Sequence, residues 1–238
     1  MKKIKALVNK LLPKKSNRRL FASWILRSHF YGFIAVTRSI YGTKKLTGKF
    51  FPVQCLVYPK MVLHLKVDKT ADVQLQGKLH VEPWFASSGS SYINISKHGK
   101  LSVNNDFILG QNIQIMISKN ASLVFGGKQK SSGSGITSDC KILVAEYVEI
   151  GEDSIIAWGC VITDSDWHDI EGTIRTKPVY IGKHVWLGHG VSILKGTRIA
   201  PDSIVGAKSL VSGAYTQPAT LLAGSPAKII KQNVTWTR

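Results

Sequence analysis

A polar segment in the second half of the chain carries side chains suited to acid–base chemistry. Residues 164–169 read Asp-Ser-Asp-Trp-His-Asp. An imidazole titrates near neutral pH, so His168 can accept a proton from a hydroxyl that would otherwise be a poor nucleophile. Asp166 or Asp169 could bind the other ring nitrogen and fix the tautomer, and the sequence leaves that choice open. We therefore predict that His168 is a general base.

Two other interpretations of this segment remain open. His168 could be a solvated histidine that only hydrogen-bonds to neighbouring aspartates. A metal site could be built from Asp164, Asp166 and His168, but three ligands at this spacing match known metal patterns weakly. We therefore expect no metal.

The residues after this segment follow a strict period of six. Aliphatic side chains recur at Ile181, Leu187, Ile193, Ile199, Val205 and Val211. Four positions after the first five of them come Val185, Val191, Thr197, Ser203 and Ser209. Helices bury residues at spacings of three and four, and strands alternate, so a period of six fits neither. It fits a solenoid of triangular coils in which each side is one hexad and each coil is buried by its neighbours.

The same period precedes the polar segment, but out of phase with the later run. Aliphatic residues recur at Val144, Ile150, Ile156 and Ile162, and Ile162 lies 19 residues before Ile181, three hexads plus one. The repeat therefore breaks between about 163 and 180. Because solenoid turns are normally tight, we predict that residues 163–180 form an extruded functional loop. A weaker run at Val103, Leu109 and Ile115 indicates earlier coils.

These patterns divide the chain into three parts. We expect residues 1–50 to be a basic, helical amphipathic segment and residues 51–226 to be the solenoid. Within the solenoid the coils are irregular over 51–138 and regular over 139–226. Residues 227–238 would form a C-terminal cap, because the last coil of a solenoid exposes an open edge.

The positive charge is concentrated at the N-terminus. The net charge is +18, and residues 1–50 contain nine Lys and four Arg but no acidic residue. Apolar residues such as Leu11, Phe21, Trp24 and Ile25 have spacings that suit amphipathic helices. We expect this segment to contact an anionic membrane surface. The alternative is a solubilising arm. A nucleic-acid partner is not expected, because no stacking platform or binding motif accompanies the charge.

Neither a membrane span nor a disulfide framework is expected. Residues 20–36 are too short for a span and contain Arg27 and His29. The cysteines Cys55, Cys140 and Cys160 are widely spaced and odd in number, which favours a reducing compartment. We expect a cytoplasmic protein, peripheral at the inner face of the membrane.

The hexads, the loop and the C-terminal string together resemble the hexapeptide-repeat acyltransferases, an all-β family whose fold is a left-handed parallel β-helix. The resemblance rests on Ile150 to His168, on Ile181 to Gly196 and on Val205 to Lys228. It is strongest to the galactoside and maltose O-acetyltransferases and to the capsule and lipopolysaccharide O-acetyltransferases. It implies acetyl-coenzyme A as the acyl donor, a homotrimer with active sites between subunits, and no need of a metal.

The resemblance also implies roles for individual residues. Those that would line the groove for coenzyme A or face its phosphates are Trp186, Gly188, His189, Ala207, Ser212, Gly213, Lys228 and Lys231. Asp139 and Trp167 would contact the acceptor. His189 and the pair Ser212-Gly213 depart from the residues common in the family, which removes one phosphate-side cation that Lys208 or Lys195 could replace. Trp186 could instead pack at a coil corner.

We therefore expect an O-acetyltransferase that modifies a hydroxyl of a cell-surface polysaccharide or of a lipid-linked saccharide precursor. An N-acetyltransferase acting on an amino sugar or an antibiotic is the alternative within the enzymes, because base catalysis by histidine serves either reaction. A non-enzymatic solenoid scaffold is the alternative outside them. A scaffold has no reason to keep both the His168 loop and the C-terminal string from Gly224 to Lys228.

Overall fold

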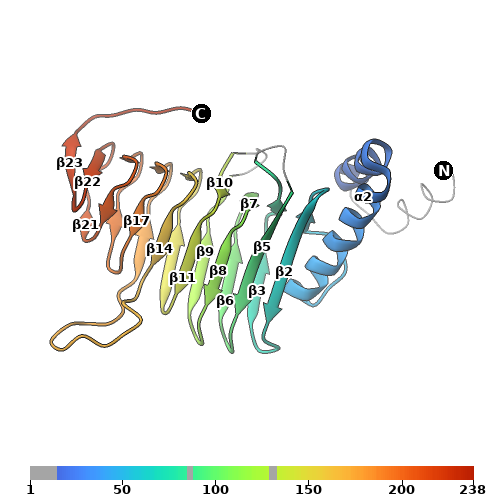
Figure 1. The fold of residues 1–238 in the computed structure, drawn as a ribbon, viewed down its shortest axis with the longest axis horizontal. Coiled ribbons are helices and arrows are strands. Elements are labelled where there is room, and N and C mark those ends of the chain that lie inside the picture. The colour runs from blue at the N-terminus through green and yellow to red at the C-terminus, as the bar shows by residue number, and fades with distance from the viewer. Residues whose placement is uncertain (1–14, 85–87, 129–132) are drawn as a thin grey trace.

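The computed structural model of the chain is a three-sided parallel β-helix with a helix at one end (Figure 1). It describes residues 15–84, 88–128 and 133–238. The expected amphipathic helix included apolar residues between positions 1 and 14, and these lie outside the described residues. The expected β-helix is confirmed, because strands of three parallel sheets follow one another in strict rotation along the chain.

The first sheet, here called sheet A, contributes one side of every coil. Its strands, in the order in which they pair, are β1 (Cys55–Val57), β4 (Leu79–Val81), β7 (Phe107–Gln111), β10 (Gly135–Ser138), β13 (Ile155–Ile156), β16 (Trp186–Leu187), β19 (Ile204–Val205), β22 (Leu221–Gly224) and β23 (Ala227–Lys231). All neighbours are parallel except β22 and β23, which are antiparallel.

The other two sheets complete each coil. Sheet B consists of β2 (Met61–Val67), β5 (Gly89–Ile95), β8 (Gln114–Ile117), β11 (Lys141–Val144), β14 (Val161–Thr163), β17 (Ser192–Ile193) and β20 (Leu210–Val211). Sheet C consists of β3 (Asp72–Leu75), β6 (Lys100–Val103), β9 (Ser122–Phe125), β12 (Tyr147–Ile150), β15 (Val179–Ile181), β18 (Arg198–Ile199) and β21 (Ala214–Tyr215). The chain therefore turns three corners per coil, called A/B, B/C and C/A below.

The hexad residues form the core, as their spacing predicted. Ile150 pairs with Ile181, Ile162 with Ile193, and Leu187 with Val205, so aliphatic side chains stack in columns inside the prism. Every aliphatic residue of the two hexad runs is buried. Buried apolar area is the main stabilising contribution in such a core.

The early coils belong to the same three sheets, although their hexads are hard to see in the sequence. Strands β2 and β5 pair over seven residues, whereas the strands after β12 are mostly two residues long. Longer strands add residues to each coil, and this hides the period of six. The stacked rings of Phe107 and Phe125, both fully buried, fill the core at this level.

A long helix covers the open edge of the first coil. Helix α2 (Lys15–Thr47) is broken at His29, where the backbone is non-helical, and its second part packs on β1. The hydroxyl of Thr43 accepts the backbone N–H groups of Gln54 and Cys55, and the hydroxyl of Ser39 accepts that of Val57. An exposed strand edge is a site of unwanted pairing, so these hydroxyls replace the missing neighbouring strand.

The opposite edge is closed by the chain's own C-terminus. Strand β23 pairs antiparallel with β22, and the residues after it run back along the coils (Figure 1). Val234 and Trp236 on this returning segment are buried. No helix among the described residues has the length and hydropathy needed to cross a bilayer.

Replacing Thr43 with Val should destabilise the N-terminal end of the β-helix. The methyl group keeps the shape but leaves the N–H groups of Gln54 and Cys55 without an acceptor, which costs about 1–3 kcal/mol. Urea denaturation followed by circular dichroism measures this loss. Thr37→Val, an exposed position on the same helix, is the matched control and should change stability by less than about 0.5 kcal/mol. Equal stability of the two variants would contradict the capping role of Thr43.

Candidate functional site

The predicted loop leaves the β-helix at the B/C corner between β14 and β15 (Figure 1). The ladder of strands continues in register on either side of it, since Val161 pairs with Ser192 and Val148 with Val179. The two arms of the loop pair with each other: Ser165 forms an antiparallel bridge with Thr176, and the N–H of Asp166 donates to the carbonyl of Arg175. The loop is thus a hairpin-like projection with a paired base.

A buried carboxylate fixes the base of this loop. Asp164 is fully buried, and its two oxygens accept the backbone N–H groups of Ala145, Glu146 and Tyr147, each at 2.7 Å. These amides belong to the B/C corner of the preceding coil. Burial raises the pKa of Asp164, and the three amide donors oppose that rise. Asp164 therefore acts as a structural anchor, and its oxygens are not available to a metal.

Asp164→Asn should loosen the loop without unfolding the coils. An amide side chain keeps the shape but has one acceptor oxygen in place of two, so at least one of the three corner amides loses its partner, at about 1–3 kcal/mol. Hydrogen exchange of the amides of residues 145–147 should become faster by at least about tenfold. Asp169→Asn, which changes a carboxylate that is 85% exposed, is the control. Unchanged exchange in the Asp164 variant would contradict the anchor.

His168 lies on the exposed part of the loop, and both neighbouring aspartates are engaged elsewhere. Asp166 pairs with Lys195 of the next coil, and Asp169 lies 3.5 Å from the guanidinium of Arg175. Within the part of the chain that the structure describes, His168 makes no hydrogen bond or ion pair. Trp167 has a left-handed backbone and donates its indole N–H to Thr163 at 3.0 Å. The loop therefore presents the imidazole outward.

No group of three histidines, cysteines or acidic side chains within the described ranges is arranged to hold a metal ion. The alternative of a metal at Asp164, Asp166 and His168 also conflicts with the contacts of its members. Asp164 is occupied by backbone amides, and Asp166 is paired with Lys195.

The residues expected to bind coenzyme A divide between two corners of the prism. Gly188, His189 and Ala207 lie at the A/B corner, whereas Ser212 and Gly213 lie at the B/C corner, two coils beyond the loop. A side chain at Gly188 would meet the backbone nitrogen of Ala207 at 2.8 Å, so only glycine fits there. One chain therefore brings Ser212 and Gly213 to the corner of the His168 loop, and it holds the other three residues at a different corner.

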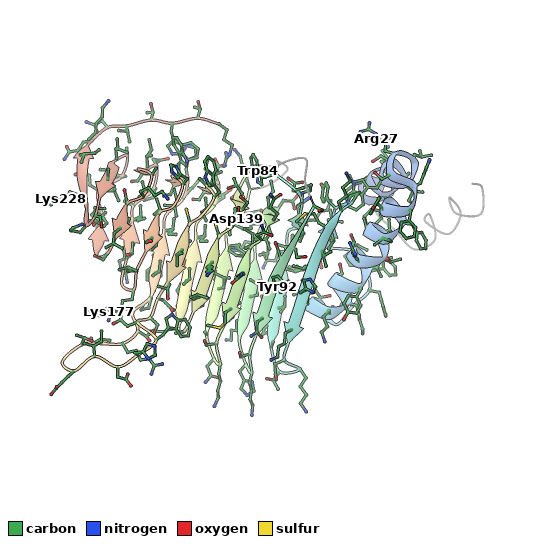
Figure 2. All side chains as sticks on the ribbon, viewed as in Figure 1. Arg27, Trp84, Tyr92, Asp139, Lys177 and Lys228 are labelled. Carbon is green, nitrogen blue, oxygen red and sulfur yellow. The ribbon has the colours of Figure 1, made fainter. Side chains whose placement is uncertain are left out.

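Cationic side chains lie near the end of the A/B corner. Lys208 extends over Gly190, and Lys228 is exposed on β23, at the end of the molecule farthest from α2 (Figure 2). Lys231 is also exposed, but it lies at the other end of β23, opposite Leu221 and toward the C/A corner. Exposed lysines beside a row of small residues fit a ligand that carries phosphates and a narrow amide-containing arm.

An apolar groove runs along the outer face of sheet A. It has a volume of about 340 Å³ and is lined by Trp84, Ile108, Thr137, Ile155, Trp158 and Trp186, among others. The ring of Trp158 stacks on that of His189 at 5.4 Å, so the groove adjoins the A/B corner. Trp186 points outward from β16 and is 39% exposed. Its side chain lines this groove and lies next to the A/B corner.

Asp139 lies at the A/B corner near the same groove. Its backbone is left-handed, and its carboxylate accepts a hydrogen bond from the side-chain amide of Asn112 at 2.9 Å. Figure 2 places Asp139 and Trp84 toward one edge of the solenoid and Lys177, on the loop, at the opposite edge. Asp139 and the His168 loop of the same chain are therefore not neighbours.

The returning C-terminal segment is clamped to the C/A corner by Asp153. This carboxylate pairs with Lys128, His184 and Arg238. The ring of Trp236 stacks on His184 at 4.0 Å and donates its N–H to the His184 carbonyl. Burial raises the pKa of Asp153, but the hydrogen bonds from its cationic partners outweigh this and hold the pKa below its ordinary value. The clamp places Arg238 at the margin of the sheet A groove.

Several contacts around the site were not predicted from the sequence. The anchoring role of Asp164 requires the three amides of another coil to converge, and no sequence signal shows that. Trp84 and Trp158 come together only through coil stacking. The pairing of Lys195 with Asp166 was also not predicted from the sequence. Both residues lie at the B/C corner of successive coils, so an alignment of the hexads could have placed them side by side.

The sequence is similar to several bacterial acetyltransferases. It is 32% identical over 180 residues to a polysialic acid O-acetyltransferase of Neisseria meningitidis, covering 63% of this chain and 84% of that protein. It is 38% identical over 101 residues to a putative lipopolysaccharide biosynthesis O-acetyl transferase, WbbJ, of Escherichia coli, covering 37% of this chain. It is 35% identical over 95 residues to a galactoside O-acetyltransferase of Lactococcus lactis, also covering 37%.

The last two matches cover 51% and 46% of those proteins, so the chain spans about half of their length. Among solved structures, the polySia-specific acetyltransferase NeuO aligns with a TM-score of 0.49 and 26% identity, covering 75% of this chain and 84% of that one. No family model matches the sequence.

Proposed function

The chain belongs to the family of hexapeptide-repeat O-acetyltransferases, and on this premise we propose that it transfers an acetyl group from acetyl-coenzyme A to a saccharide hydroxyl. The acceptor would be a cell-surface polysaccharide or its lipid-linked precursor. The observation that carries the proposal is the His168 loop. It projects from a ladder that stays in register beneath it, its base is anchored by Asp164, and it holds an unpaired imidazole in solvent.

His168 acts as the general base in this proposal. Acetyl-coenzyme A supplies the thioester carbonyl carbon. One ring nitrogen of His168 takes the proton of the acceptor hydroxyl as its oxygen attacks that carbon, and the protonated ring then returns a proton to the departing sulfur. An exposed, unpaired ring suits this role, because a hydroxyl can approach either nitrogen. Lys195 and Asp166 position the loop and do not themselves transfer the proton.

The A/B corner is the proposed donor site. Glycine at 188 lets neighbouring coils approach closely, because a side chain there would meet the backbone of Ala207. The pantetheine arm would lie along the outside of this corner, where Ala207 is exposed. Lys208 and Lys228 provide the positive charge that the phosphates of coenzyme A require. Trp186 and His189 lie beside this path, and Ser212 with Gly213 would contribute from the B/C corner of another chain.

We propose that the active site is completed between two copies of the chain, in a homotrimer. Within one chain the His168 loop and the residues Gly188 and Ala207 lie at different corners of the prism. A loop that projects away from its own coils can reach a corner of a neighbouring copy. In a cyclic trimer each interface would then pair one loop with one donor corner.

His168→Ala should abolish acetyl transfer and leave the fold intact. Removal of a general base lowers kcat by about 10²–10⁴-fold. The measurement is thiol release from acetyl-coenzyme A in the presence of sialic acid oligomers, galactosides and amino sugars, with circular dichroism as the check of folding.

His98→Ala is the control, because His98 is an exposed histidine at a turn of the solenoid and lies outside the proposed site. It should keep full activity. Near-normal turnover in the His168 variant would end its role as base. Binding of coenzyme A without release by any acceptor in the wild type would reject these acceptors, and an absence of both binding and release would reject the transferase.

Mixed oligomers test whether the site is shared between chains. His168→Ala removes the base, and Ala207→Glu places an anionic side chain at an exposed donor-corner position. Each variant alone should be inactive. Co-expressed in equal amounts, they should recover about a quarter of wild-type activity, because random assembly leaves about one interface in four with both elements intact.

Co-expression of Ala207→Glu with Lys208→Glu is the matched control, since both changes affect the same corner. This pair should recover nothing if each single variant is inactive. Failure of the first pair to recover activity, with both variants assembled into trimers, would mean that one chain supplies the whole site.

A further inference from the structure

The second part of helix α2 differs in composition from an ordinary surface helix. An amphipathic helix normally buries its large apolar residues and exposes polar ones. The second part of α2 buries Leu46 and otherwise mostly small or hydroxyl-bearing residues against the first coil, namely Gly32, Ala35, Val36, Ser39, Gly42 and Thr43. This is explained by the strand edge beneath it, which requires hydroxyl acceptors and close approach.

The aromatic residues in the second part of α2 face away from the protein instead. Phe30 is 71% exposed, Phe33 58% and Tyr41 61%. With Thr37 and Lys44 they have the spacing of three and four that forms one stripe of a helix. Leu26, just before the break at His29, is 65% exposed, and Tyr31 borders the stripe at 53%. We call Phe30, Phe33 and Tyr41 the outer apolar face.

Two aromatic residues expected on the membrane side are not part of this face. Phe21 is fully buried, and Trp24 is buried against Tyr58 with ring centroids 4.6 Å apart. These two residues attach the first part of α2 to the β-helix. The outer apolar face is thus left without a partner in the described part of the chain, although contiguous exposed apolar residues are uncommon on soluble monomers.

Positive charge surrounds the outer apolar face. Arg19, Arg27, Lys44, Lys45 and Lys49 are all exposed on or next to α2. No acidic residue occurs in the first 67 positions of the sequence. Arg27 lies two residues before the break at His29, at the top of the helix in Figure 2. Two copies of this face placed against each other would bring like charges together, which disfavours self-association through it.

We propose that the outer apolar face of α2 is a docking surface for a bilayer containing anionic lipids. Phenylalanine side chains on one face of a helix partition into the boundary between headgroups and acyl chains. Each neighbouring lysine or arginine adds attraction to anionic headgroups. The helix lies on the membrane and does not cross it, in agreement with the lack of a spanning helix among the described residues.

This docking fixes where the chemistry takes place, on the assumption that the proposed function holds. Four strand spacings along sheet B separate β2, next to α2, from β14, which leads into the His168 loop. At about 4.8 Å per spacing, the loop lies about 20 Å from the first coil. A lipid-linked acceptor would therefore be acetylated several sugar units away from its lipid anchor.

Vesicle co-sedimentation of the full-length protein tests the docking directly. The vesicles are phosphatidylcholine with about 30% phosphatidylglycerol, and pure phosphatidylcholine is the neutral comparison. The triple variant Phe30→Gln, Phe33→Gln, Tyr41→Gln keeps helix-forming side chains and all charges. It should bind the anionic vesicles at least about tenfold more weakly than the wild type.

The matched control replaces three exposed apolar residues elsewhere, Tyr92→Gln, Ile229→Gln and Ile230→Gln, and should bind like the wild type. Raising the salt to about 0.5 M should weaken wild-type binding, because it screens the lysine and arginine charges. Circular dichroism confirms that α2 is retained in both variants.

Equal binding by the triple variant and the wild type would overturn the proposal. So would a change of oligomeric state in the triple variant without vesicles, since the face would then be a contact between proteins. Vesicle binding requires no acceptor and no turnover. The docking can therefore fail while acetyl transfer is intact, and acetyl transfer can fail while docking is intact.

Discussion

The ladder of hydrogen bonds between successive coils is the constraint on which the rest of the structure depends. Each coil satisfies its backbone groups through the coil before and the coil after it, so all coils must keep the same register at all three sides. The two ends of the ladder need substitutes for a neighbour. At one end the hydroxyls of Ser39 and Thr43 take this place, and at the other end β23 does. Added residues can leave the ladder only at a corner.

The regular coils could be predicted because one hexad corresponds to one side of the prism. A residue such as Ile193 or Val205 is therefore identified as inward-facing by its spacing alone, and the 19-residue interval before Ile181 locates the loop. The early coils were harder to recognise. Strands β2 and β5 are seven residues long, so the period varies from coil to coil and Phe107 and Phe125 do not stand out as stacked neighbours.

The contacts around the site could be predicted only in part. The sequence places His168 on an extruded loop, which the structure bears out. It does not show that Asp166 pairs with Lys195, or that Asp164 binds amides 17 to 19 positions earlier, because both contacts form only when coils stack. The sequence also placed Phe21 and Trp24 on an amphipathic segment expected to contact a membrane. The structure buries both rings in an apolar cluster with Val53 and Leu56.

Strand β14 pairs with β17 without interruption beneath the loop. Residues can therefore be inserted into the loop without changing the stability of the core. Because Ile162 meets Ile193 as if no residues lay between their coils, the loop can lengthen, shorten or change composition while the buried columns stay the same. Homologous chains could thus keep one coil framework while this single segment changes. Selection on chemistry and selection on folding would act on different residues, and the loop would vary faster than the hexads that support it.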